Sequence, residues 1–152
     1  MTNTWILVAD STRARLFEQG PADKTFGEVA CFTNPDGHAP GRRAAEDRLP
    51  RVNESVGRVR HAIEPRTSLR DKSTDHFAHT LAEALAHGHN DHLYDRLVLV
   101  APAHFLGVLR GNLGKLVAGC IVGEIGRNLT TRPVAELHAS LPREMLVAGL
   151  AS

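Results

Sequence analysis

Residues 97–101 (Leu-Val-Leu-Val-Ala) form an almost unbroken apolar run between a charged pair and Pro102. A run of this length and setting predicts a strand that is buried on both faces. Phe105, Leu106 and Leu109 follow at helical spacing. A buried strand that leads directly into an amphipathic helix is half of a crossover unit. The rest of the chain must cover both faces of this strand, so the sequence predicts an α/β domain.

The other apolar segments complete an order of three strands, a long loop, and then helix, strand, helix, strand, helix. Further strands are predicted at 5–9, 13–18, 26–33 and 117–125, and helices at about 73–88, 103–113 and 134–141. Short turns between the first three strands favour an antiparallel meander, and right-handed crossovers would make the first and fourth strands parallel neighbours. We therefore expect a three-layer α/β/α fold with a mixed five-stranded sheet, formed by this meander and two β-α crossovers.

The chain of 152 residues has the size of a single domain. Its net charge of +1 gives no global attraction to nucleic acids or membranes, although a local asymmetry could. The N-terminal apolar run stops at Asp10, which is too early for a signal peptide or a membrane span. We expect a cytoplasmic protein with no membrane partner. Cys31 and Cys120 lie in apolar, strand-like segments and are expected to be buried, reduced thiols.

Residues 34–72 differ from the rest of the chain. This segment has four prolines, little apolar periodicity and nine of the 18 Lys and Arg residues, together with six acids. A loop this long inside one domain is usually functional or disordered, and the planar fork of arginine suits phosphate contacts. The segment is therefore either an RNA- or phosphate-binding loop or a solvated loop neutralised by its own acids. The candidate binding residues are Arg42, Arg43, Arg48, Arg51, Arg58 and Arg60.

A second candidate site lies where the strands at 5–9 and 97–101 end. Ligands usually bind beyond the carboxyl ends of such parallel strands. Asp10, Ser11, Arg13 and His104 are expected near this crevice. They could bind a small anion or phosphate, or serve a Ser-His-Asp hydrolase, although two sequence neighbours such as Asp10 and Ser11 favour an Asx turn.

Other chemistry finds little support in the sequence, and we predict no cofactor, no metal and no catalytic residue. The strand at 97–101 supplies no carboxylate at its end for a metal nuclease of the ribonuclease H type. His76 and His79 share a helical face, but no further ligands complete a zinc site. The glycines after residue 106 do not match a phosphate loop. A protein-interaction module remains a further possibility.

Four segments resemble the bacterial host-attachment protein family, in the same order along nearly the whole chain. They are 8–18 (VADSTRARLFE), 58–65 (RVRHAIEP), 101–110 (APAHFLGVLR) and 124–130 (EIGRNLT). That family is similar to the middle domain of archaeal and eukaryotic release factors and of Pelota, a fold shared with ribonuclease H-like proteins. Asn128 departs from the family pattern Glu-Ile-x-x-Asp-Leu-Thr, which removes a carboxylate from this position.

The resemblance also bears on activity. Release factors hydrolyse peptidyl-tRNA with a Gly-Gly-Gln loop between the meander and the long helix. The corresponding segment here, 34–72, contains no glutamine, and the single one in the chain is Gln19. The resemblance thus implies a non-enzymatic, cytosolic protein that binds RNA or the ribosome through its basic loop and acts indirectly in attachment to host cells. The alternative is a small-molecule or phosphate-binding enzyme at the crevice of Asp10 and His104.

Overall fold

The computed structural model describes residues 3–20, 26–35 and 57–142, with the backbone alone described for 57–70. These residues form five strands and four helices. The strands are β1 (Thr4–Ala9), β2 (Arg13–Gln19), β3 (Gly27–Thr33), β4 (Arg96–Val100) and β5 (Ile121–Ile125). The helices are α2 (Gly57–Asn90), α3 (Ala103–Asn112), α4 (Lys115–Ala118) and α5 (Val134–Ser140).

The five strands form one mixed sheet in the order β3-β2-β1-β4-β5. β1 pairs antiparallel with β2, and β2 pairs antiparallel with β3. β1 and β4 are parallel neighbours, as are β4 and β5. Leu7 of β1 lies between Leu16 of β2 and Leu99 of β4. The predicted meander and the parallel pairing of the first and fourth strands are confirmed.

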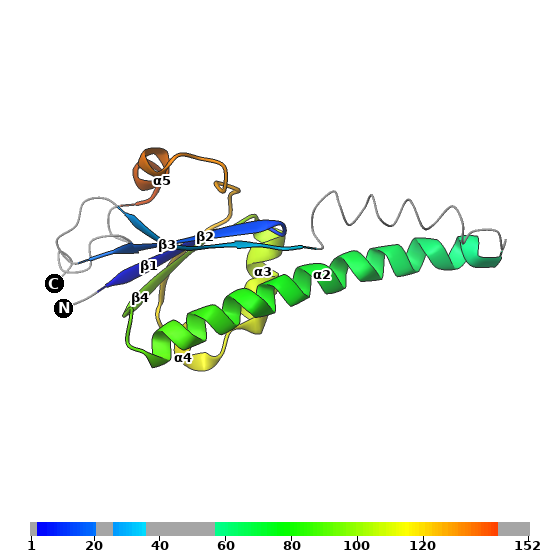
Figure 1. Cartoon of the computed structure of the whole chain (residues 1–152), viewed down its shortest axis with the longest axis horizontal. Coiled ribbons are helices and arrows are strands. Elements are labelled where there is room, and N and C mark those ends of the chain that lie inside the picture. The colour runs from blue at the N-terminus through cyan, green and yellow to red at the C-terminus, as the bar shows by residue number, and fades with distance from the viewer. Residues whose placement is uncertain (1–2, 21–25, 36–56, 143–152) are drawn as a thin grey trace.

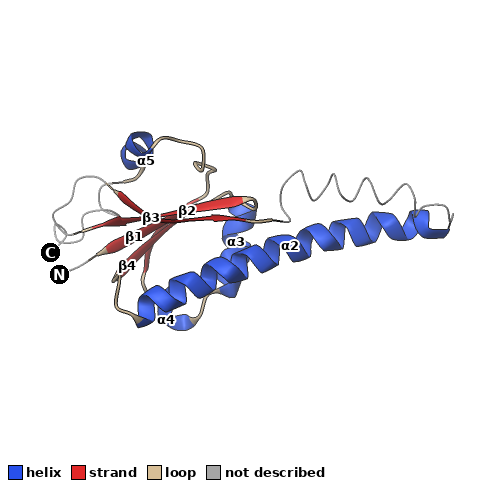
Figure 2. Cartoon of the chain, in the orientation of Figure 1, coloured by secondary structure: helices blue, strands red, loops and turns tan. Residues whose placement is uncertain are grey.

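Helices pack on both faces of this sheet (Figure 1). Successive side chains of a strand point to opposite faces, so β1 is buried along its whole length. Leu7 faces a core that includes Leu81 of α2 and Phe105 of α3. Val8 faces a second core that includes Leu137 of α5. Figure 2 shows the sheet between α2 and α3 on one face and α5 on the other.

The long helix α2 begins 16 residues earlier than the sequence predicted. We expected Ser73 to start it, but α2 runs from Gly57 to Asn90, so residues 57–72 of the predicted basic loop are helical. From residue 71 onward, the first buried side chain of α2 is that of Phe77. The earlier half projects beyond the sheet (Figure 1), so packing on the sheet imposes no apolar periodicity on it. Pro65 inside the helix also disguised it in the sequence.

The edges of the sheet differ from prediction in detail. The expected strand 117–125 begins only at Ile121, because α4 occupies its first residues. Each edge strand carries a bulge: the register skips Val29 in β3 and Val122 in β5. Both valines are exposed, by 46% and 41%. Bulges interrupt the regular edge and discourage pairing with another chain.

The turn between α2 and β4 is fixed by two aromatic rings. Trp5 and Tyr94 stack with ring centroids 4.6 Å apart, and the Tyr94 hydroxyl donates a hydrogen bond to the Leu85 carbonyl. Gly88 lies against the indole, because a Cβ at this position would be 2.5 Å from the Trp5 ring. The last turn of α2 is therefore held to β1 and to the start of β4.

Candidate functional site

The carboxyl end of β1 continues into a turn built by Asp10. Its Oδ1 atom accepts hydrogen bonds from the Thr12 backbone N–H at 2.8 Å, the Thr12 hydroxyl at 2.8 Å and the Arg13 N–H at 2.9 Å. This is an Asx turn, the local role that the sequence favoured for Asp10. The carboxylate thus shapes the β1–β2 connection.

The loop after β5 repeats the same motif with Asn128 and Thr130. Asn128 Oδ1 accepts hydrogen bonds from the Thr130 backbone N–H at 3.1 Å and from the Thr130 hydroxyl at 2.7 Å. Two further hydrogen bonds join the two turns. Asn128 Nδ2 and Thr130 Oγ1 each donate to Asp10 Oδ2 at a distance of 3.1 Å. The single hydroxyl proton of Thr130 can serve one acceptor at a time. The paired turns, defined as Asp10, Thr12, Asn128 and Thr130, connect segments 118 residues apart.

The electrostatics of the paired turns favour an ionised Asp10. Burial opposes ionisation, but the hydrogen bonds from Thr12, Arg13 and Asn128 outweigh it and hold the pKa of Asp10 below its ordinary value of 3.8. Both oxygens already accept hydrogen bonds, which leaves little capacity for a proton, a metal or a substrate. Asn128 suits this place because an aspartate would bring a second carboxylate next to Asp10 and could not donate to it.

A buried asparagine lies beside these turns and connects the two ends of the basic segment. The side-chain amide of Asn34 donates to the Ser11 carbonyl at 2.9 Å and to the Ser73 hydroxyl at 3.1 Å. Its backbone N–H donates to the Thr12 carbonyl at 2.9 Å. Asn34 is only 2% exposed. The Asn34–Ser73 bond therefore joins the residue before the excursion, residues 35–72, to the residue after it.

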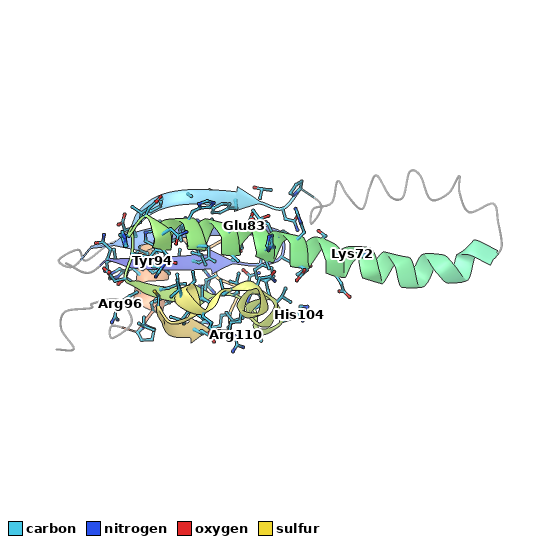
Figure 3. The ribbon with its side chains drawn as sticks, turned by 90° about the horizontal axis from the view of Figure 1, so that it is seen from below. Lys72, Glu83, Tyr94, Arg96, His104 and Arg110 are labelled. Atoms are coloured by element: carbon cyan, nitrogen blue, oxygen red, sulfur yellow. The ribbon has the colours of Figure 1, made fainter. Side chains whose placement is uncertain are left out.

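His104 lies in different surroundings from Asp10. It is an exposed residue of the first turn of α3 and lines a hollow of about 270 Å³. The other residues that line the hollow, among those the structure describes, are Asp71, Thr74, Asp75 and Val108. Asp10, Ser11 and Arg13 share the β1–β2 turn, and none of the three lines this hollow. Figure 3 shows His104 on α3 beside the point where α2 leaves the body of the protein.

The six candidate arginines fall into two groups. Arg58 and Arg60 belong to the projecting half of α2. Lys72, near the base of that projection, is exposed (Figure 3). The remaining four lie outside the described residues: Arg42, Arg43, Arg48 and Arg51.

Neither cysteine is an activated thiol, since the pKa of each is raised. Contrary to prediction, Cys31 is exposed and Cys120 is only partly buried, because β3 is an edge strand and Cys120 precedes β5. A hydrogen bond to Glu28 and slight burial raise the pKa of Cys31, so the reactive thiolate is disfavoured. Within residues 3–20, 26–35 and 71–142, no group of three or more His, Cys, Asp or Glu side chains could hold a metal ion.

The sequence contains the same signal for both of the paired turns, although only the turn at Asp10 was predicted from it. Asp-x-Thr at 10–12 and Asn-x-Thr at 128–130 are both patterns typical of Asx turns. The link between them and the contact of Asn34 with Ser73 had no signal in the sequence, since each depends on the tertiary fold. Family comparison covers all of these positions: the model for "protein required for attachment to host cells" matches residues 5–141.

The chain belongs to the host-attachment protein family. The matched region of this host-attachment protein contains the sheet from Trp5 onward, the paired turns and the excursion. No protein with curated annotation matches the chain significantly. Among the described residues, no helix combines the length and apolar character needed to cross a membrane.

Proposed function

We propose that this host-attachment protein is a non-enzymatic, cytosolic protein that binds RNA or the translation machinery through its excursion. In this proposal its contribution to attachment to host cells is indirect. The element order, a meander followed by two crossovers, is also that of the release-factor middle domain and of ribonuclease H-like proteins, and we include this relationship in the proposal. Fold similarity alone would be a weak basis for function, so the charge distribution carries the argument.

The charge of the chain is divided unevenly between the excursion and the rest. Residues 35–72 contain nine basic and six acidic residues, a net charge of +3. The remaining residues contain nine basic and eleven acidic ones, a net charge of −2. A polyanion would therefore be attracted to the excursion and repelled by the body of the protein. This asymmetry is the observation on which the proposal depends.

The projecting half of α2 gives part of this charge a rigid support. Residues 57–72 would span about 24 Å at about 1.5 Å per residue. At about 100° per residue, four of its five basic positions fall within an arc of about 160°, and Glu64 and Asp71 fall on the other side. The four positions are those of Arg58, Arg66, Arg70 and Lys72. One side of the helix is thus basic along its length, which suits a row of phosphates.

The Asn34–Ser73 bond supports the proposal mechanically. It holds the beginning and the end of the excursion at the same point of the body, beside the β1–β2 turn. The 38 residues between Asn34 and Ser73 can then extend away from the body of the protein while the strands and helices of the body stay in place. Both oxygens of the Asp10 carboxylate accept hydrogen bonds within the paired turns, which argues against the alternative of an enzyme at the crevice, because these bonds compete with the proton that a catalytic base must accept.

Co-sedimentation with ribosomes from a cell lysate would test the proposal. The wild type should sediment with ribosomes at about 50 mM salt and be released at about 500 mM, because phosphate contacts depend steeply on salt. Arg66→Gln with Arg70→Gln should weaken the association while preserving the helix, since glutamine is neutral and a good helix former. The variant with serine at the candidate loop positions should weaken it further; these positions are Arg42, Arg43, Arg48 and Arg51.

A matched control removes the same charge from the body. Lys115 of α4 and Arg132 before α5 are exposed and lie outside the excursion. Lys115→Gln with Arg132→Gln should leave the association unchanged. Absence of co-sedimentation at any salt, or equal losses in both double variants, would contradict the proposal. Salt-independent co-purification with a protein would instead favour an interaction module.

A further inference from the structure

We infer that the chain forms a homodimer through an apolar patch at the amino ends of two parallel strands, β4 and β5. The dimer patch is defined as Leu93, Leu116 and Cys120. It is separate from the excursion and from the paired turns, so this inference goes beyond the proposed function and does not rest on it. The partner to which we commit is a second copy of this chain, related to the first by a two-fold axis.

The dimer patch lies where β4 and β5 begin. Leu93 lies in the turn between α2 and β4, and Leu116 lies in α4, which precedes β5. The Leu97 N–H of β4 donates to the Cys120 carbonyl at 2.8 Å, and the Cys120 thiol donates to the Leu116 carbonyl at 3.5 Å. Both leucines therefore lie at the same end of the sheet, with Leu93 on the β4 side of Cys120 and Leu116 on its α4 side. Figure 1 shows α4 beside the last turns of α2.

Both leucines of the dimer patch are exposed, although their sequence neighbours belong to the core. Leu116 is 70% exposed and Leu93 is 45% exposed, whereas Val117 and Tyr94 are buried. Cys120 between them is only partly buried. A single exposed leucine is ordinary on a monomer, but two leucines beside a partly exposed thiol give an apolar surface that burial against a partner would stabilise.

Opposite charges lie at the two ends of the dimer patch. Burial raises the pKa of the Cys120 thiol, and the negative charge of Asp95 raises it further, which places this carboxylate beside the patch on the Leu93 side. Lys115 directly precedes Leu116 at the other end and is exposed. Among the described residues, neither Lys115 nor Asp95 takes part in an ion pair. Both charges are therefore available to a partner.

A two-fold axis through Cys120 makes this surface complementary to itself. In such an interface the same patch is used by both copies, so every contact between two different residues occurs twice. Leu116 of one copy would face Leu93 of the other, and Lys115 would face Asp95. Two ion pairs would then flank an apolar centre with two leucines from each copy. An apolar centre within a charged rim is the usual arrangement of protein interfaces.

Pairing of edge strands is the less suitable route to a dimer. Bulges interrupt both edges of the sheet, whereas the dimer patch requires no strand pairing. A patch of this size suits a weak dimer, with a dissociation constant in the micromolar range. At the submicromolar concentration of a ribosome assay the protein would be monomeric, so Lys115→Gln with Arg132→Gln remains a valid control there.

Sedimentation equilibrium of the full-length protein would test this inference. The mass should rise from that of a monomer toward that of a dimer between about 1 and about 300 µM. Leu93→Ser with Leu116→Ser should weaken the dimer at least tenfold, because both apolar contacts are lost. The matched control is Val29→Ser, which changes a side chain of similar exposure, 46%, on β3 at an edge of the sheet. It should leave dimerisation unchanged, and circular dichroism should show that both variants remain folded.

Exchange of the two charges tests the two-fold arrangement itself. Lys115→Glu should weaken the dimer by placing two carboxylates opposite each other, and Asp95→Lys should weaken it by placing two ammonium groups opposite each other. The double variant should restore the dimer, because the charges have exchanged places across the interface.

Each outcome bears on the inference without affecting the proposed function. A wild type that stays monomeric over the whole concentration range would overturn the inference. A dimer that survives Leu93→Ser with Leu116→Ser, or that is lost equally in Val29→Ser, would also overturn it by placing the contact elsewhere. Failure of the charge-exchanged variant to restore the dimer would overturn the two-fold arrangement. Ribosome co-sedimentation stands or fails independently of all these results.

Discussion

The two halves of α2 belong to one helix but obey different constraints. The half from Ser73 to Asn90 packs on the sheet, and its buried positions recur at helical spacing, as in Phe77, Leu81 and Leu85. The half from Gly57 to Lys72 projects from the body and carries five basic residues. Helical structure from Ser73 to Asn90 is stabilised by burial against the sheet. Helical structure from Gly57 to Lys72 is stabilised by continuity with that packed half. A single continuous helix can therefore join a segment whose residues pack on the sheet to a segment whose residues are mainly charged.

The largest expected difference between the halves is in stability. Leu81→Ala should lower the free energy of unfolding by about 3 kcal/mol, because Leu81 is 1% exposed and its loss leaves a cavity. Lys72→Ala should change it by less than about 0.5 kcal/mol, because Lys72 is exposed. Urea denaturation monitored by circular dichroism would measure both. Similar losses in the two variants would mean that the base of the projection also packs on the body.

A glycine tests how closely the packed half approaches the sheet. Gly88→Ala should destabilise the protein by about 1–2 kcal/mol, since the added Cβ would overlap the Trp5 ring by more than the helix preference of alanine can offset. Trp5→Phe should relieve the overlap, so the double variant should lose less than the sum of the two. Thermal unfolding of the four proteins gives this coupling. Strict additivity would show that the ring moves aside freely.

The paired turns lie beside the junction of the two halves, and their charge can be tested by pH. Asp10→Asn should cost about 1–2 kcal/mol at pH 7, because the new amide cannot accept the bonds from Asn128 and Thr130 at that atom. Its lowered pKa means that Asp10 stabilises the wild type above about pH 4, and that this contribution is lost as the pH falls through the folded-state pKa. Unfolding experiments from pH 7 to pH 2 should therefore show a flatter profile for the variant.

The matched variant at the other turn has the opposite dependence. Asn128→Asp places two carboxylates together, so its destabilisation at pH 7 should shrink in acid. Asp10→Asn with Asn128→Asp should recover part of the stability, because the donor and the acceptor have exchanged places. No recovery in the double variant would show that the link between the two turns contributes little.

The smallest expected effect is at the end of the packed half. His92 has a φ of 58°, and it and Leu93 donate to the carbonyls of His89 and Gly88 in a Schellman motif. His92→Gly should raise the free energy of unfolding by about 0.5–1 kcal/mol, because glycine adopts this conformation without strain. Guanidinium denaturation would measure the gain. A loss instead would mean that the imidazole makes a stabilising contact.

Much of the sheet followed from the sequence, because its signals are local. The apolar runs at 5–9 and 97–101 located β1 and β4, and the handedness of crossovers then determined that they are parallel neighbours. The Asx turn at Asp10 also followed from residue type. The surroundings of the two candidate sites were harder to predict from the sequence. His104 was expected beside Asp10 because both follow parallel strands, but the side chains of α2 and α3 around His104 come from the tertiary packing.

The sequence by itself determined the order of the elements, the buried strands and the concentration of basic residues in 34–72. The tertiary structure decided that residues 57–72 continue α2, that Asn34 joins Ser73, and that Asn128 donates to Asp10. The difference has a physical cause. Strands and turns depend on neighbouring side chains, whereas a projecting helix and bonds across 39 or 118 residues exist only once the sheet has brought distant segments together.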